Sequence, residues 1–397
     1  MASNQDISNQ GISNQDVTED FSDAFVQDVP KQDVYPHKRA PSNRAAWLTG
    51  RSARPLMVCA APYTPPSPHQ IVVKNGAVAI NTVECTKQLE GNMMAPPDQV
   101  GDMVSRFKVG DRVLAHALSM DPAVNKSSEG AFQHYTVIND NMAATIPDWL
   151  SFEEACVVPL GFSTAATALF HEDYLNLNRP GVPLGTGPDW LPEVVLVWGG
   201  STSVGCNAIQ LAAAAGYEVI ATCAPNNFQY ITSLGASAVF DNRDVFSVFS
   251  IIELCHHKRV VGAIAIGKNS TEPCMAILAR SIGSKLVARA KFPFPESIPT
   301  TIFQKVRSMA ASMRSNLRIK IWTKRCGVKT KFISDTSAAH TELGAMVYNE
   351  FLPGALAAGV FVAAPKPRVV GKGLDRIQSA MDCHMRGVSA QKVVVSL

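Results

Sequence analysis

Apolar residues between positions 45 and 137 come in short alternating runs that prolines and glycines separate. The runs lie at 45–48, 56–58, 70–81, 107–115 and 130–137, and four prolines fall between 60 and 68. Alternating apolar and polar residues bounded by turn residues are typical of strands. Short strands at this spacing predict a small antiparallel barrel, with 70–81 as one longer strand or a hairpin.

The apolar spacing becomes helical after position 150. Ser151 and Glu154 form the pattern of a capping box, and helix is predicted over 155–160 and 163–170. From 194 to roughly 290, short apolar runs alternate with helical segments, which is the order of elements in a parallel sheet. The helical pattern returns from 343, and the apolar run 392–395 predicts a last strand.

The stretch Val194–Gly205 is the most informative part of the chain. Its sequence is VVLVWGGSTSVG, and an amphipathic segment at 206–215 and further apolar runs at 217–221 and 234–241 follow it. A buried strand, a turn of small residues and a helix predict a dinucleotide-binding βαβ unit, because a diphosphate must approach the N-terminus of the helix closely. Thr202 stands where a strict G-x-G-x-x-G has glycine, so the pattern alone leaves an ordinary strand-to-helix turn open.

The end of the second predicted strand bears on the choice of cofactor. Residues 222–227 are Thr-Cys-Ala-Pro-Asn-Asn, without a carboxylate. An acidic residue at this point usually holds the ribose 2′-hydroxyl of NAD and would repel a 2′-phosphate. We therefore expect NADPH, although no Arg or Lys stands in the turn and neutral donors must hold the phosphate.

Composition and charge bound the class of protein. The chain has 397 residues, of which 46% are hydrophobic, enough for two domains with separate cores. Lys and Arg number 36 against 33 Asp and Glu, and six of these acids fall in the first thirty residues, where no base occurs. The remainder is mildly basic, which suits an anionic cofactor.

The ends and the cysteines indicate a cytoplasmic protein. Nine cysteines are scattered without a C-x-x-C pair, and no secretory signal pattern or apolar run of transmembrane length accompanies them. They are expected to be reduced thiols, and no membrane association is expected. Three copies of one polar pentad open the chain, so residues 1–40 are predicted to be disordered.

Several longer pieces of the sequence carry a family resemblance. They are NGAVAIN at 75–81, RFKVGDRV at 106–113, WGGSTSVG at 198–205 and VSAQKVVV at 388–395, with a Pro-Leu-Gly junction at 159–161. In this order they resemble the medium-chain dehydrogenase/reductase superfamily, and within it the zinc-independent quinone oxidoreductases and the fungal trans-acting enoyl reductases of polyketide pathways. The resemblance covers Asn43 to Leu397.

The resemblance implies an α/β fold with a GroES-like antiparallel barrel domain and a doubly wound Rossmann domain. It implies a catalytic domain at 41–175 and 336–397 and an NADPH-binding domain at 176–335, with cofactor and substrate between them. The implied partner is a small-molecule, polyketide-like substrate, and the implied assembly is a monomer or homodimer. No nucleic acid is expected.

The resemblance also implies the site residues. Asn81, Glu84 and Thr164 are the catalytic candidates, with Thr164 near the nicotinamide. Asn81 and Glu84 belong to Asn-Thr-Val-Glu, where related reductases have Asn-Pro-Val-Asp, and position 224 is alanine where relatives can offer serine. The cofactor-binding candidates follow three predicted strands: Gly199, Gly200, Ser201, Thr202, Ser203, Val204, Gly205, Thr222, Ala224, Pro225, Asn226, Asn227, Ile266 and Gly267.

Zinc is not expected. Asn81 stands where zinc-dependent relatives have a ligand cysteine, and no lobe of four close cysteines exists. Cys85 with either His116 or His134 is a conceivable ligand set, against the alternative of a buried cysteine and surface histidines.

The segment 297–334 holds nine bases and no acid. Because no pattern of stacking aromatic residues accompanies the bases, we expect a solvated face or an entrance for an anionic substrate rather than a nucleic-acid site.

These features predict an oxidoreductase that transfers a hydride from NADPH to an activated C=C or C=O of a small or medium-sized apolar metabolite, with enoyl reduction favoured. Without a metal, hydrogen-bond donors must stabilise the developing enolate and a side chain or water must protonate it. Tyr135 and Tyr230 are candidates for the acid by residue type only. The alternative is a catalytically silent dinucleotide-binding protein that acts as a partner or sensor.

The segment 88–104 supports that alternative. The chain passes almost directly from Pro97 to Val104, where similar proteins carry additional residues, so the barrel is expected to lack one or two strands. We therefore expect an unstable, weakly active chain in which the isolated region 176–335 binds NADPH about as well as the whole.

Overall fold

The structure is a computed structural model that describes residues 41–90, 105–181, 191–290, 302–333 and 337–397. The described residues belong to one compact unit, Pro41–Leu397. The predicted disordered tail at 1–40 lies outside the described residues, as does 91–104 of the segment 88–104 in which the barrel is predicted to be shortened.

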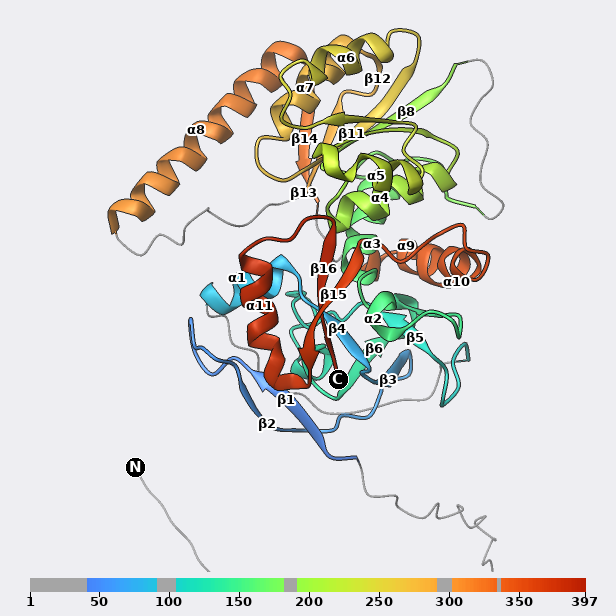
Figure 1. The fold of residues 1–397 in the computed structure, drawn as a ribbon, viewed down its shortest axis with the longest axis vertical. Coiled ribbons are helices and arrows are strands. Elements are labelled where there is room, and N and C mark those ends of the chain that lie inside the picture. The colour runs from blue at the N-terminus through green and yellow to red at the C-terminus, as the bar shows by residue number, and fades with distance from the viewer. Residues whose placement is uncertain (1–40, 91–104, 182–190, 291–301, 334–336) are drawn as a thin grey trace, which may run out of the picture. The chain divides into compact units, whose positions relative to one another are not determined.

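A seven-stranded parallel sheet forms the centre of the α/β part of the chain (Figure 1). The strands follow the order β10-β9-β8-β11-β13-β14, with β12 beside β11, and each pairing is parallel. Their bounds are β8 Glu193–Trp198, β9 Glu218–Cys223, β10 Ala238–Asp241, β11 Arg259–Ile266, β12 Ile282–Gly283, β13 Leu286–Ala290 and β14 Lys329–Phe332. The parallel sheet and the βαβ unit predicted from the sequence are therefore both present.

Helices cover both faces of this sheet, because successive side chains of a strand point to opposite sides. Val195 and Val197 of β8 pack with helices α4 (Ser203–Ala214) and α5 (Phe228–Ser233). Leu196 and Trp198 pack with α6 (Ser247–Leu254) and α7 (Thr271–Arg280) on the other face. Burial on both faces explains why β8 is a continuous apolar run rather than an alternating one.

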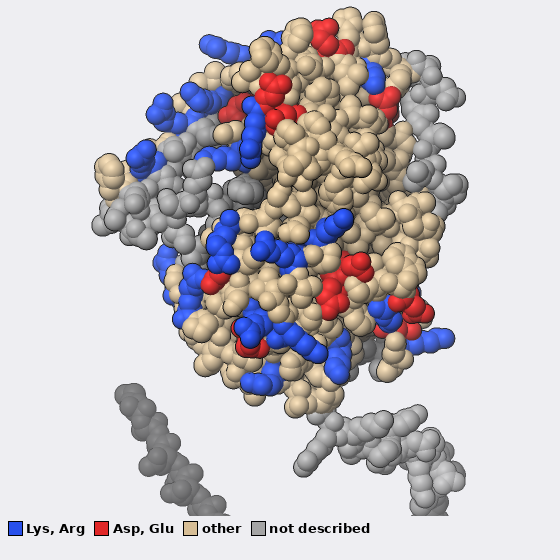
Figure 2. Space-filling model, in the orientation of Figure 1, with Lys and Arg blue, Asp and Glu red and all other residues tan. Residues whose placement is uncertain are grey.

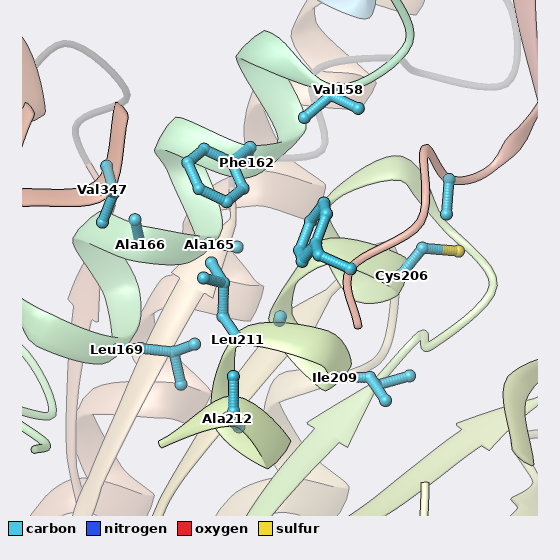
Figure 3. Packing of buried hydrophobic residues seen from close by; sticks show 14 of the residues in the cluster. Val158, Phe162, Ala165, Ala166, Leu169, Cys206, Ile209, Leu211, Ala212 and Val347 are labelled. Atoms are coloured by element: carbon cyan, nitrogen blue, oxygen red, sulfur yellow. The ribbon is translucent and has the colours of Figure 1, made fainter. Parts of the chain in front are cut away.

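Helix α3 (Pro159–Phe170) packs directly on α4. Figure 3 shows Phe162 and Leu169 of α3 close to Leu211 and Ala212 of α4, and all four are fully buried. At Gly161 the two helices approach so closely that a Cβ atom would lie 3.0 Å from Nδ2 of Asn207. The segment that leads out of the antiparallel part thus shares one core with the glycine-turn helix.

The sequence pattern did not predict helix α8 (Ile302–Cys326), which lies in the base-rich segment 297–334. Its described side chains are mostly exposed, and they include both bases and large apolar residues such as Phe303 and Met313. Figure 2 shows Lys and Arg side chains along this helix, as expected for a solvated basic face. No helix within the described ranges is long and apolar enough to cross a membrane.

The antiparallel part consists of short strands in small sheets. β1 pairs with β2, β3 with β6, β5 with β7 and β4 with β16, all antiparallel, while β15 pairs with β16 in parallel. The bounds are β1 Asn43–Trp47, β2 Met57–Ala61, β3 Gln70–Lys74, β4 Ala77–Ala79, β5 Val113–Ala115, β6 Tyr135–Asn139, β7 Ala143–Thr145, β15 Lys366–Lys372 and β16 Gln391–Ser396. The run 70–81 is thus neither one strand nor a hairpin, because β3 and β4 pair with different partners.

The remaining helices connect and cover these strands: α1 Thr82–Glu90, α2 Phe152–Ala155, α9 Glu342–Ala345, a π-helical turn Met346–Phe351, α10 Leu352–Ala357 and α11 Ile377–Met385. The capping box predicted at the start of α2 is present, since Ser151 accepts from the Glu154 N–H and the Glu154 carboxylate accepts from the Ser151 N–H. Helix α1 was not predicted, and it begins at the candidate site residues.

The packing of Gly205 generates a prediction. A Cβ atom at this position would overlap the Gly199 carbonyl oxygen and lie 2.7 Å from Cα of Gly200, which are rigid backbone atoms. Gly205→Ala should therefore destabilise the protein by about 2 kcal/mol or more, seen as a lower midpoint in thermal unfolding.

Gly354→Ala is the matched control, because Gly354 lies in α10 with no atom within 4 Å of the position that an added methyl group would occupy. This control should melt at the wild-type temperature or above it, since Ala favours helix. Equal melting temperatures for both variants would contradict the packing argument.

Candidate active site

The glycine turn that follows β8 is fixed by bonds to the neighbouring strand. Gly199 has φ +96°, a conformation that favours glycine. The N–H groups of Gly199 and Gly200 both donate to the Thr222 carbonyl, at 3.2 and 2.7 Å. Thr202 caps helix α4 by accepting from the Gly205 N–H at 3.0 Å. Threonine at the position of the expected glycine therefore supplies the helix cap.

The turn lies at the carboxyl edge of the sheet, where the strand order reverses. From β8 the chain continues to β9 on one side, while β11 lies on the other side. A crevice at such a point is the usual ligand site of an open α/β sheet. Gly199 comes so near the end of β11 that a Cβ atom would lie 2.8 Å from the Ile266 carbonyl oxygen. The structure thus brings together three predicted segments, at 199–205, 222–227 and 266–267.

The predicted residues after β9 have different surroundings. Thr222 is fully buried, and its hydroxyl accepts from the Gly199 N–H at 3.2 Å, so its side chain supports the turn. Pro225 and Asn226 are exposed. Asn227 is buried and donates to the Ser389 hydroxyl at 3.2 Å. The exposed amide of Asn226 is therefore the better placed of the two Asn side chains to meet a ligand from solvent.

A buried lysine links the glycine turn to the catalytic candidates. The Lys392 ammonium, on β16, donates to Oδ1 of Asn81 and, at 3.3 Å, to the hydroxyl of Ser203 at the start of α4. Asn81 Nδ2 donates to Glu84 Oε1 at 3.1 Å, and the Asn81 N–H donates to Glu84 Oε2 at 2.7 Å. Asn81 and Glu84 therefore orient the lysine, and the amide of Asn81 is fully engaged in doing so.

The charges of this cluster depend on burial. Lys392 is 6% exposed, and burial is the largest cause that lowers its pKa to about 8, against the opposing attraction of Glu84. Burial raises the pKa of the Glu84 carboxyl, while its hydrogen bonds to Asn81 and the positive charge of Lys392 oppose the rise. Below pH 8 the Lys392 ammonium is therefore charged beside the N-terminus of α4, and both the ammonium and the helix N-terminus attract an anion.

A cavity of about 600 Å³ adjoins the cluster. Asn81 and Glu84 line it together with Cys156, whose thiol has its pKa raised to about 12 by burial and stays protonated. Most of the other lining residues are apolar, and β3, β4, β5 and the start of α3 supply a part of them. A cavity of this size, apolar with a few polar groups, is typical of a small-molecule site.

Of the remaining candidates, Thr164 and Tyr135 lie at or next to the cavity, whereas Tyr230 does not line it. Leu160 lines the cavity, and Thr164 lies one helical turn further along α3, where its hydroxyl donates to the Leu160 carbonyl at 2.8 Å. Tyr135 lines the cavity, with its ring 5.5 Å from that of Tyr63. Tyr230 lies on α5 and is not among the lining residues.

Two of the possible zinc ligands, Cys85 and His116, contact other groups of the protein. The Cys85 thiol, which is buried, points to the Met381 carbonyl at 3.9 Å, and His116 bonds to Ser163 through Nδ1 at 3.0 Å. Within the described ranges, no three His, Cys, Asp or Glu side chains come close enough to hold a metal ion.

Lys392 was not predicted from the sequence as a site residue, and His116 was predicted only as a possible metal ligand. Lys392 belongs to the stretch VSAQKVVV that carried the resemblance, but nothing in its spacing shows that strand β16 brings it to Asn81. The signal that could have found it is a lone lysine at the edge of an apolar strand, where a charge is costly unless it is paired.

Comparisons with known proteins agree with this geometry. No family model matches the chain. It is 44% identical over 374 residues to the dehydrogenase pigH of Monascus ruber, covering 90% of this chain and 100% of that protein. It is 34% identical over 368 residues to the trans-enoyl reductase himH of Aspergillus japonicus, covering 89% of this chain and 97% of that protein.

Solved structures share the fold. The CurK enoyl reductase superposes with a TM-score of 0.63 at 18% identity, over 89% of this chain and 99% of that chain. The Escherichia coli quinone oxidoreductase in complex with NADPH superposes with a TM-score of 0.57 at 18% identity, over 89% and 100% of the two chains.

The chain belongs to the medium-chain dehydrogenase/reductase superfamily, as the sequence predicted. The GroES-like barrel with a Rossmann domain is therefore confirmed as its fold. Within the superfamily it is similar to fungal dehydrogenases and trans-enoyl reductases, so it is an oxidoreductase.

The lysine generates a prediction about cofactor binding. Because burial lowers the pKa of Lys392 to about 8, its charge is present below that pH and is lost above it. If the ammonium attracts the cofactor's phosphates, the affinity for NADPH should fall as the pH rises through about 8. Lys392→Met should raise the dissociation constant about tenfold or more and abolish this dependence.

Titration calorimetry between pH 7 and pH 9 measures both effects, with Lys372→Met on the adjacent strand β15 as a control for losing an exposed lysine. The control should keep the wild-type affinity and pH profile. An unchanged pH profile in Lys392→Met would contradict the assignment.

Proposed function

We propose that the chain is an NADPH-dependent, zinc-independent reductase that transfers a hydride to an activated C=C, as in an enone or enoyl group, or to a C=O of a small or medium-sized apolar metabolite of secondary metabolism. One observation carries the proposal: Lys392 bonds both to Ser203 at the glycine turn and to Asn81 on the cavity wall. Groups that suit a dinucleotide and groups that suit an apolar substrate are thus joined by a single side chain.

The residues fit a dinucleotide at the turn. Helix α4 begins with Ser203, Val204 and Gly205, whose small size lets a diphosphate reach the helix N-terminus. Gly267 follows β11 with φ +92° and has no atom within 4 Å of a Cβ position, so space remains beside it. When bound, the reduced nicotinamide supplies the hydride.

Enone reduction suits the charges of the site. Hydride addition to the β-carbon leaves negative charge on the enolate oxygen, and a pre-oriented donor in an apolar site stabilises such charge strongly. The ammonium of Lys392 is held beside the cavity by Asn81, which lines the cavity, and by Ser203, so its positive charge favours an enolate there. The names of the relatives, trans-enoyl reductase himH and CurK enoyl reductase, support a C=C over a C=O.

The decisive experiment follows the hydride. NADPH carrying deuterium at C4 is mixed with the full-length chain and a panel of enones, and the products are analysed by NMR. Deuterium at the β-carbon supports the proposed function, and deuterium at the carbonyl carbon supports the C=O form of it. A chelator added to a parallel sample should leave turnover unchanged. Binding of NADPH without any turnover would favour the catalytically silent alternative.

Cofactor choice generates a separate prediction. Asn226 is exposed at the end of β9, in a turn without a carboxylate. We expect NADPH to bind about tenfold or more tightly than NADH, because a 2′-phosphate gains charge-assisted hydrogen bonds there. Asn226→Asp should remove that preference, since its carboxylate repels the phosphate and accepts from a ribose hydroxyl.

Dissociation constants for both cofactors measure the preference. Asn178→Asp, at an exposed position before β8, adds the same charge elsewhere and should keep the wild-type ratio. Equal affinities of the wild-type chain for both cofactors would contradict the choice of NADPH.

A further inference from the structure

A chain of three buried side chains runs from the cavity into the core. His116 Nδ1 lies 3.0 Å from the Ser163 hydroxyl, which lies 2.8 Å from the Tyr348 hydroxyl. Tyr348 in turn donates to the Pro159 carbonyl at 3.0 Å. Ser163 and Tyr348 are fully buried, and His116 is 7% exposed and lines the cavity.

The carbonyl at the end of this chain fixes the direction of every bond. A carbonyl can only accept, so Tyr348 must give its single hydroxyl proton to Pro159. Ser163 must then give its own proton to Tyr348, and therefore it accepts from His116. All three contacts are hydrogen bonds only in this arrangement, in which Nδ1 of His116 carries the proton.

The imidazole is neutral, so its other nitrogen carries a lone pair. Burial is the largest cause that lowers the pKa of His116 to about 4, with Lys392 lowering it further and Asp121 opposing. Nε2 has no hydrogen-bond partner within the described residues. It is not among the buried polar atoms that lack a partner there, so it remains accessible to solvent. Because the ring lines the cavity, this acceptor opens to the cavity.

We propose that Nε2 of His116 accepts a hydrogen bond from a hydroxyl group of the substrate, so that the cavity selects hydroxylated enones or enoyl compounds. The effect expected on turnover rests on the proposed function, whereas the hydrogen bond between the hydroxyl group and His116 does not depend on it. Among the other polar side chains that line the cavity, the Cys156 thiol donates to the Glu153 carbonyl, and the Asn75 amide donates to other groups of the protein. The Tyr135 hydroxyl can donate. His116 is neutral with its N–H turned inward, so it offers the cavity an acceptor.

The first test observes the tautomer without any ligand. In full-length protein labelled with nitrogen-15 in histidine, two-bond proton–nitrogen correlations distinguish Nδ1–H from Nε2–H, and His116→Gln identifies the signal by removing it. The expected result at pH 7 is a neutral ring with the proton on Nδ1. Ser163→Ala should release the ring into a mixture of tautomers. A wild-type ring with its proton on Nε2, or a charged ring, would overturn the proposal.

The second test compares substrates that differ in one hydroxyl. The probes are 4-phenyl-3-buten-2-one and its ortho-, meta- and para-hydroxy isomers, reduced with NADPH. At least one isomer should have a KM lower than that of the parent by about three- to tenfold, the effect of one hydrogen bond, with a similar kcat. His116→Phe should lose this advantage, while His116→Gln, which keeps an acceptor oxygen, should retain most of it.

The control is His257→Phe, at an exposed position after α6, which should behave as wild type. The same hydroxyl advantage in wild type and His116→Phe would overturn the proposal. If no enone is reduced, the proposed function fails. Titration of the labelled protein with the same four compounds then tests whether Nε2 of His116 binds the hydroxyl group. A shift of its Nε2 signal by a hydroxylated isomer alone supports the proposal, and no shift overturns it.

Discussion

The site depends on one constraint, that a buried ammonium must have partners. Lys392 is 6% exposed, and an unpaired charge at such a position would be too costly to keep. Its partners come from separate parts of the chain: Asn81 before α1, Ser203 at the start of α4 and the carboxylate of Glu84 nearby. Because the lysine must satisfy all of them, the C-terminal strand, the cavity wall and the glycine turn are held in one arrangement.

The close packing of α3 on α4 also restricts the position of Ser203. A methyl group at Gly161 would lie 2.8 Å from the Ser203 carbonyl oxygen, so the start of α4 is confined between α3 and the sheet. The residue that meets Lys392 is therefore also the residue against which α3 packs. Small side chains at 161 and 203 serve the packing of two helices as much as they serve a ligand.

The sequence predicted the parts of the fold that depend on local patterns. The run Val194–Trp198 is apolar throughout because β8 is buried on both faces, and the capping box at Ser151 is a local arrangement of four residues. Helix α8 was missed because the segment was interpreted by its bases alone. Large apolar residues do recur there at helical spacing, although their side chains are exposed: Phe303, Val306, Met313, Leu317 and Ile321. The pairing of β4 with β16 was missed because partners more than three hundred residues apart leave no local trace.

The site shows the same limit. Asn81 and Glu84 are three residues apart, and their bond could be anticipated from sequence, but Lys392 meets them only through the pairing of β16 with β4. The expectation that region 176–335 binds NADPH as well as the whole chain did not take into account a cation supplied from position 392. Likewise His116, Ser163 and Tyr348 come from three distant segments, and only the folded chain aligns their hydroxyl and ring groups.

The π-helical turn at Met346–Phe351 sets a length requirement on the C-terminal part. A π turn contains one residue more than an α turn, and each residue of a helix rotates the next side chain by about 100°. The extra residue determines the angular position at which Tyr348 leaves its helix and reaches Pro159. Removing a single residue from this turn would point the phenol elsewhere and leave Ser163 without its acceptor. The number of residues in this turn, and not only their identity, is therefore under constraint.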